Sequence, residues 1–341
     1  MQKPFSVVNL HCDLLGCIEA NNNLGFESEE IRCSLPQELD GGVKLETLAI
    51  AAISSDKSAK QGERQVKLYL DMLKKYSDKV GSFLRGDSED KLLFLFAIEN
   101  ASVLAIDDEP LTLAFDRFER YNTVEKILYI SFTWNEENRF GGGNITKVGI
   151  KEDGKTLLEY MSGKGVAIDF SHTSDQLAYD IINHIEKKGL QIPFIASHSN
   201  YRCVKDIPRN LPDEIAKEII KRNGVIGLNF VRRFVGEKSS DFLLHIEHAL
   251  SLGGENAIAL GADFYGGFPL PKYMQTPEYY PPFQKDFSDA STYQRFLQMV
   301  SDRFSQDLVE KIAHQNGRNF IKQLQNQVAS LKIVAEKNLH R

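Results

Sequence analysis

The sequence has no hydrophobic run long enough to cross a membrane. Its longest apolar stretch, residues 45–53, contains Glu46 and is less than half of the roughly 20 residues that a transmembrane helix needs. The first residues lack the apolar segment and small-residue cleavage site of a signal peptide, because a predicted strand already begins at Phe5. We therefore expect a cytoplasmic protein with no membrane partner.

Basic clusters and cysteine pairs are also missing. The 41 Lys and Arg residues are outnumbered by 47 Asp and Glu residues, and no basic block occurs, which argues against nucleic acid as a partner. Four cysteines without a Cys-x-x-Cys spacing are too few for a disulfide framework, so we expect reduced thiols. The glycines at 141–143 lack the spacing and context of a dinucleotide-binding motif.

The sequence does contain eight short apolar runs that are typical of buried strands. They are continuous rather than alternating, as expected for parallel strands covered on both faces. Helical periodicity fills most of the gaps, for example at 64–79, 175–188 and 212–222. Eight alternations predict an α/β fold with a single (β/α)8 TIM-type barrel. The runs are residues 5–10, 47–53, 92–98, 127–132, 165–170, 193–197, 225–230 and 257–261.

Repeats and linkers are absent, so we predict a single domain over residues 1–341. Residues 266–283 contain five prolines and three tyrosines, which predicts a long irregular loop at the barrel mouth. The C-terminal extension, about 290–341, is helical in pattern with Gly317 as an interruption. We expect it to pack against the barrel wall.

Polar residues follow several of these runs, where a barrel carries its catalytic groups. Side chains two apart on a strand share a face, so the first pair, His11 and Asp13, can bind one cation together. A carboxylate can bridge two divalent ions, and two ions can hold a hydroxide as the nucleophile. The pattern predicts a metallohydrolase. The residues concerned are His11, Asp13, Glu99, His172, His198 and Asp263.

Other metal-binding candidates are weaker. His245 and His248 are three residues apart on a predicted helix and could hold a metal, but a solvated helix face is the favoured interpretation. Cys12 points to the opposite side of its strand from His11 and Asp13, so we interpret it as a small core residue. A cysteine protease is not supported, because no cysteine stands at a helix start beside an obvious histidine partner.

Longer segments carry a family resemblance. They are 169–172 (DFSH), 193–199 (PFIASHS), 206–213 (DIPRNLPD) and 261–266 (GADFYG). Together with the preceding residues from His11 onward, they resemble the renal, or membrane, dipeptidases, which are zinc-dependent dipeptidases on an amidohydrolase-like barrel. The resemblance implies hydrolysis of dipeptides, including those with a C-terminal D-residue, by a homodimer.

The resemblance also implies a ligand set for two zinc ions, or other divalent metals. His11 and Asp13 match the ligands of one ion, and His172 and His198 match those of the other. Glu99 matches the carboxylate that bridges the two ions.

Three further positions match residues that act on the substrate. Arg209 matches the arginine that binds the carboxylate of the dipeptide, a task for which a guanidinium fork is suited. Asp263 matches the aspartate that moves the proton from water to the leaving amine. Trp134 replaces the histidine that contacts the oxyanion in mammalian members, and Tyr265 replaces a second aspartate. An indole can donate a hydrogen bond but carries no positive charge.

Two alternative functions remain open. Related deaminases usually begin with His-x-His, and many lactonase-type enzymes bridge their metals with a modified lysine, whereas this chain has His-x-Asp and Glu99. A non-catalytic peptide-binding barrel is the other alternative, and the presence of all five ligand positions disfavours it.

Overall fold

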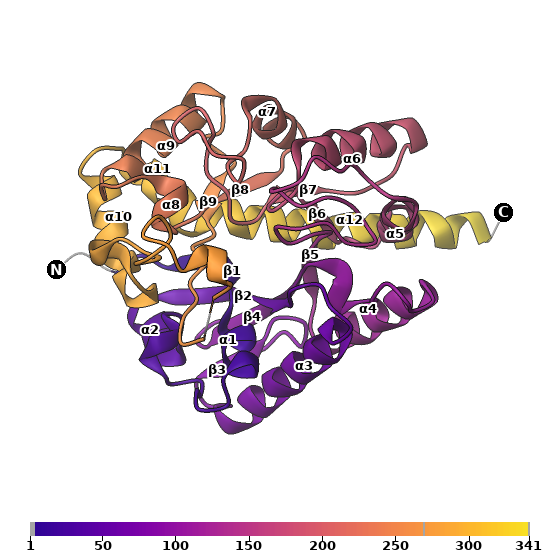
Figure 1. Ribbon diagram of the computed structural model, residues 1–341, viewed down its shortest axis with the longest axis horizontal. Coiled ribbons are helices and arrows are strands. Elements are labelled where there is room, and N and C mark those ends of the chain that lie inside the picture. The colour runs from indigo at the N-terminus through magenta and orange to yellow at the C-terminus, as the bar shows by residue number, and fades with distance from the viewer. Residues whose placement is uncertain (1–3, 269, 340–341) are drawn as a thin grey trace.

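Eight parallel strands close into a barrel in the computed structural model, which describes residues 4–268 and 270–339 (Figure 1). Around the barrel the order is β1, β2, β4, β5, β6, β7, β8 and β9, and β9 pairs with β1 to complete it. This confirms the predicted (β/α)8 TIM-type barrel. The strands are β1 (Val7–Cys12), β2 (Val43–Ala51), β4 (Leu92–Glu99), β5 (Ile127–Ser131), β6 (Ala167–Asp169), β7 (Phe194–Ala196), β8 (Val225–Leu228) and β9 (Ile258–Leu260).

Two details of the sheet differ from the sequence-based expectation. β2 begins at Val43 rather than at residue 47, because the polar residues Lys44 and Glu46 interrupt the apolar pattern although Glu46 is fully buried. A short extra strand, β3 (Val80–Ser82), pairs with the start of β4. It is too short and too small in its side chains to stand out as an apolar run.

Helices cover the outside of the barrel, and their amphipathic faces pack onto the strands (Figure 1). α6 shows how the sequence sets an element: the Ser174 side chain accepts a hydrogen bond from the Leu177 amide at its start, and Gly189 ends it in the left-handed conformation. The outer helices are α3 (Ser58–Lys75), α4 (Thr112–Val124), α5 (Glu152–Met161), α6 (Asp175–Lys188), α7 (Asp213–Lys221) and α9 (Asp241–Ser251). Shorter helices are α1 (Leu14–Ala20), α2 (Leu35–Asp40), α8 (Arg232–Val235), α10 (Tyr293–Ser301) and α11 (Gln306–Glu310).

The last helix, α12 (Asn316–Leu339), closes one end of the barrel. Its residues Phe320, Ile321 and Leu324 join the cluster of side chains that fill the barrel interior, including Val8 and Leu45 near the starts of their strands. The expectation for residues 290–341 named the barrel wall, whereas the described side chains of α12 pack at one end of the barrel. The helix forms the barrel floor, because its apolar face covers the hydrophobic side chains at the starts of the strands.

The opposite end of the barrel is covered by the irregular loop predicted at 266–283, within its described residues. Phe268, Leu270, Met274 and Tyr279 of this loop line a cavity at the carboxyl ends of the strands. No helix among the described residues combines the length and the apolar character that a bilayer-spanning segment requires.

Candidate metal centre

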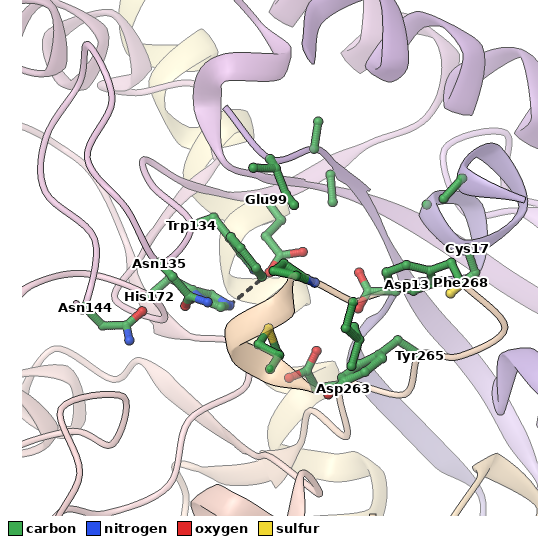
Figure 2. A pocket seen from close by; sticks show the side chains of 18 of the residues that line it. Asp13, Cys17, Glu99, Trp134, Asn135, Asn144, His172, Asp263, Tyr265 and Phe268 are labelled. Carbon is green, nitrogen blue, oxygen red and sulfur yellow. Dashed lines mark hydrogen bonds and ion pairs between the residues drawn. The ribbon is translucent and has the colours of Figure 1, made fainter. Parts of the chain in front are cut away.

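The predicted metal-binding residues meet at the carboxyl end of the barrel. His11 lies near the end of β1, Asp13 stands at the start of α1, and Glu99 is the last residue of β4. His172 and His198 follow β6 and β7. Figure 2 shows the side chains of Asp13, Glu99 and His172 directed into one space, with Asp263 on its lower side. The structure therefore brings together residues that are up to 252 positions apart, as His11 and Asp263 show.

Glu99 stands between two groups of ligand atoms. Its Oε2 atom is 3.6 Å from His11 Nε2, and its Oε1 atom is 3.0 Å from His172 Nε2 and 3.7 Å from His198 Nε2. His11 Nε2 also lies 3.8 Å from Asp13 Oδ1. The two oxygens of one carboxylate thus face different sets of donors, which is the arrangement a bridging ligand requires.

A hydrogen bond fixes the orientation and tautomer of His11. The Tyr129 hydroxyl donates to the Leu10 carbonyl oxygen at 3.0 Å and lies 2.6 Å from His11 Nδ1. Since its proton is already committed, this hydroxyl accepts from Nδ1–H. His11 Nε2 is therefore unprotonated and carries a lone pair. This buried nitrogen has no hydrogen-bond partner among the described residues. An oriented, unpartnered imidazole nitrogen is what a metal ion needs.

The other two histidines are held in the same tautomer. His172 Nδ1 is 2.9 Å from the amide oxygen Asn135 Oδ1, which can only accept. The Ser197 hydroxyl donates to Asp169 at 2.7 Å and accepts from His198 Nδ1 at 2.7 Å. The Nε2 atoms of His172 and His198 are then both unprotonated, and their lone pairs face each other across 2.9 Å. Two lone pairs this close repel each other unless a cation lies near both, so this pair fits a metal ligand role.

Burial sets the protonation states of the centre. It lowers the pKa of His11 to about 3, helped by the charge of Arg209, and lowers the pKa values of His172 and His198 well below the ordinary value. These imidazoles are therefore neutral at pH 7, the form that binds metal. Burial raises the pKa of Asp13 to about 7.

The pKa values of the two remaining acids of the centre respond to burial and to neighbouring charges. Desolvation, followed by the charge of Asp13, raises the pKa values of Glu99 and Asp263 well above their usual range. Three carboxyl groups therefore crowd together with neutral imidazoles. Cations bound among them would restore the charged forms.

Two of the site residues adopt backbone conformations that are rare for residues with a side chain. His172 has φ +67° and Asp263 has φ +62°. Such left-handed positions cost free energy at non-glycine residues and cluster at functional sites. Here they turn both side chains toward the centre immediately after β6 and β9.

Arg209 lies in the wall of the cavity as a buried cation. The cavity has a volume of about 810 Å³ and includes Asp13, Glu99, His172 and Asp263 in its lining. The guanidinium donates to Ser199 Oγ at 2.9 Å and to the His198 carbonyl oxygen at 3.0 Å, while Nε has no partner. None of the ion pairs among the described residues includes Arg209. It is therefore available to an anion that enters the cavity.

The two positions that depart from the family pattern also line the cavity. The ring centroid of Trp134 is 6.1 Å from that of His172. The buried Tyr265 hydroxyl has no hydrogen-bond partner among the described residues. The sequence-based roles of these two residues, of Arg209 and of the ligands stay predictions.

Sequence reasoning missed Tyr129, Asn135 and Ser197, which orient the three histidines, and Asp169, which accepts from Ser197. It also missed Asn229, which donates to Asp263. Most lie at strand ends, where polar character was a usable signal, but Tyr129 is hidden in an apolar run.

The interpretation of His245 as a residue on a solvated helix face is wrong. This histidine is fully buried, and its Nε2 lies 3.0 Å from the Val235 carbonyl oxygen. Its Nδ1 accepts a hydrogen bond from the Tyr201 amide at 3.3 Å. Both ring nitrogens are occupied, so the residue is structural.

Comparison with protein families gives one match that covers nearly the whole chain. The family model described as membrane dipeptidase (peptidase family M19) matches residues 1–333. An uncharacterised protein encoded in the pqqA 5′ region of Klebsiella pneumoniae is 32% identical over 149 residues, which cover 39% of this chain and 53% of that protein. The chain thus spans about half the length of the curated relatives it matches.

Solved structures share the fold. A metallopeptidase from Rhodobacter sphaeroides, liganded with a phosphinate mimic of the dipeptide L-Ala-D-Ala, superposes with a TM-score of 0.79 at 18% identity, covering 94% of this chain and 99% of that chain. A metallopeptidase of family M19 named dipeptidase AC gives a TM-score of 0.77 at 19% identity, covering 94% of this chain and 98% of that chain.

Proposed function

The chain belongs to the membrane dipeptidase family, and from that premise we propose that it is a metal-dependent dipeptidase that works with two zinc ions. The observation that carries the proposal is the position of Glu99, whose two oxygens face separate sets of donors. A site for a single metal ion would need only one oxygen of Glu99 to face such a set.

The residues present fit two metal ions. His11 and Asp13 would hold one ion, His172 and His198 the other, and Glu99 both. The unpartnered Nε2 of His11 supports this assignment, as does the locked tautomer of each histidine. Bound zinc ions would supply Lewis-acid polarisation of the scissile carbonyl and activation of water.

Asp263 is the proposed proton carrier. Its Oδ1 atom lies 3.6 Å from His11 Nε2, and Asn229 donates to its Oδ2 atom at 2.8 Å. That amide holds one oxygen in place and leaves the other directed at the centre. From there, Asp263 can take a proton from the attacking water and deliver it to the departing amine, which must leave protonated at neutral pH.

Arg209 is the proposed anchor for the free carboxylate of the dipeptide. It is a buried cation in the wall of the cavity and lacks an ion-pair partner among the described side chains. A substrate that supplied its own carboxylate would complete a charge-assisted pair and place its peptide bond beside Glu99 and Asp263. Because the Rhodobacter sphaeroides relative is liganded with a mimic of L-Ala-D-Ala, we extend the proposed substrates to dipeptides with a C-terminal D-residue.

A comparison of free and amidated dipeptides tests this function. The zinc-loaded protein should hydrolyse a panel of L,L and L,D dipeptides, and amidated versions should be poor substrates. Arg209→Ala should lower kcat/KM for free dipeptides by roughly 30- to 4,000-fold, equivalent to about 2–5 kcal/mol.

The amidated substrates are the matched control for Arg209→Ala, because they lack the group that Arg209 is proposed to read. The variant should change their slow turnover little. No hydrolysis of any dipeptide would refute the activity, and equal turnover of free and amidated dipeptides would refute the role of Arg209.

A further inference from the structure

A second group of metal-ligating side chains lies on the other side of β1 from the metal centre. Cys12 of β1, Cys33 of the following loop and Glu38 of α2 each offer one ligand atom, and the Sγ and carboxylate oxygen atoms lie within 4.8 Å of one another. We propose that Cys12, Cys33 and Glu38 bind a third, structural zinc ion. The proposal does not depend on the enzymatic activity.

The geometry of the group suits zinc. Zinc bound by two thiolates at about 2.3 Å and a carboxylate oxygen at about 2.0 Å holds its ligand atoms roughly 3.5–3.8 Å apart. Side chains whose donor atoms already lie within 4.8 Å need to contract by only about 1 Å. A carboxylate can bind with both oxygens, so Glu38 can complete four donor atoms.

Unsatisfied polar atoms point to a missing partner. Glu38 is fully buried, and neither of its oxygens receives a hydrogen bond from an amide, hydroxyl or ammonium group among the described residues. Its one side-chain partner among them is the Glu46 carboxyl, which lies within hydrogen-bond reach, so one of the two buried acids must carry a proton in the absence of a cation. Glu46 is also bound by Asn9 and by the Thr47 amide. The Tyr293 hydroxyl is also buried and unpartnered. A pair of buried acids without a paired cation is costly, and a divalent ion would remove that cost.

The thiols of the group already make weak contacts, including one between Cys12 and Cys33. Cys33 Sγ lies 3.2 Å from the Phe264 carbonyl oxygen, to which a thiol donates a weak hydrogen bond. Zinc binding would replace this bond with a metal–thiolate bond and release the protons of both thiols, Cys12 and Cys33. The exchange is favourable, because structural zinc sites contribute far more free energy than one S–H···O contact.

The location of the site suggests what it stabilises. Cys12 lies between the proposed ligands His11 and Asp13 and bridges to Phe264, the neighbour of Asp263. Cys33 and Glu38 come from the segment between β1 and β2. An ion bound here would join these segments beneath the catalytic cavity and limit their relative movement.

X-ray absorption at the zinc edge tests the proposal on the native, full-length protein. All proposed ligands of the catalytic centre are nitrogen and oxygen, so a zinc–sulfur shell at about 2.3 Å can come only from a cysteine site. We expect three zinc ions per chain and, on average, two sulfur neighbours per three ions. Cobalt substitution should add a thiolate-to-cobalt charge-transfer band in the near-ultraviolet.

Variants then assign the sulfur signal. Cys33→Ser should remove one zinc ion per chain and the sulfur shell while leaving the nitrogen and oxygen shell in place. Cys17→Ser, which removes another buried thiol, is the matched control and should leave the sulfur shell unchanged. If Cys33→Ser does not fold, Glu38→Gln with the same readout replaces it. Two zinc ions without sulfur neighbours, or a Cys12–Cys33 disulfide in the purified protein, would overturn the proposal.

Discussion

Each histidine of the metal centre depends on a neighbour that occupies its far nitrogen. Tyr129, Asn135 and Ser197 each accept the Nδ1 proton of one imidazole, and so leave Nε2 free. Such outer partners usually matter to metal affinity almost as much as the ligands themselves. The residues that orient the ligands are therefore as good a target for mutation as the ligands.

Tyr129→Phe should weaken metal binding without disturbing the barrel. The variant keeps the ring that fills the interior but loses the acceptor for His11 Nδ1. We expect the affinity for at least one ion to fall about 10- to 100-fold in a chelator competition. Tyr69→Phe is the control, since its hydroxyl donates to Glu125 far from the centre, and it should alter stability alone. An equal effect on metal affinity in both variants would contradict this role.

Asp263 should be more important for turnover than Trp134. Asp263→Asn keeps the shape and the contact with Asn229 but cannot carry a proton, so kcat should fall by orders of magnitude. Trp134→Phe removes at most one neutral hydrogen bond and should cost about tenfold, or about 1.4 kcal/mol.

Steady-state kinetics with metal analysis on the same samples decides between these roles. Both variants should retain the metal content of the native protein. An inactive Trp134→Phe beside an active Asp263→Asn would reverse the assignment.

The sequence pointed to the proposed ligands, which lie together in the structure, but not to the residues that support them. His11, His172 and His198 stand out because each is a polar residue at the end of an apolar run. Tyr129 lies inside such a run, and an aromatic residue there is typical of core packing. Only the closure of the barrel, in which β5 lies three strands from β1, shows that the Tyr129 hydroxyl meets His11 across the interior.

At the level of elements, the eight strands were predictable because parallel barrel strands are apolar on both faces. The start of β2 was not, because Glu46 is buried beside Asn9 rather than exposed. The position of α12 at the barrel floor was also not predictable from the sequence. Amphipathic periodicity shows that a helix has a partner but not which one, and the floor of the barrel is formed by strand starts distant in sequence.

The contact between α12 and the barrel floor should be sensitive to side-chain size. A Cβ atom on Gly317 would lie 2.9 Å from Val8 Cγ1, so the helix approaches β1 as closely as a glycine permits. Gly317→Val should therefore destabilise the protein by about 1–3 kcal/mol, as overpacking does, and thermal unfolding measures the loss. Gly16→Val is the matched control, because a Cβ atom there meets nothing within 4 Å. Equal melting temperatures for the two variants would show that α12 can shift freely.

For the whole molecule, metal binding should contribute to stability. The centre gathers neutral histidines and acids whose burial is costly without cations. Because ions bind the folded state, each site at 100 times its Kd adds about 2.7 kcal/mol. Chelation should lower Tm, and zinc should restore it.

Glu99→Gln tests whether the two sites act together. Because one carboxylate serves both, this variant should lose affinity at both sites of the metal centre, and added zinc should raise its Tm less than it raises the Tm of the native protein. Full retention of one tight site with only nitrogen and oxygen ligands in Glu99→Gln would show that Glu99 does not bridge.

The positions of the site residues along the chain have a consequence for protein synthesis. Residues 11–198 contain all five proposed ligands, whereas Asp263 and β9, which pairs with β1 to close the barrel, come later. A nascent chain on the ribosome therefore exposes its coordinating side chains long before it gains the proposed proton carrier. Translation that stops before β9 yields a chain that carries all five proposed ligands but lacks both the proposed proton carrier and the strand that closes the barrel around them.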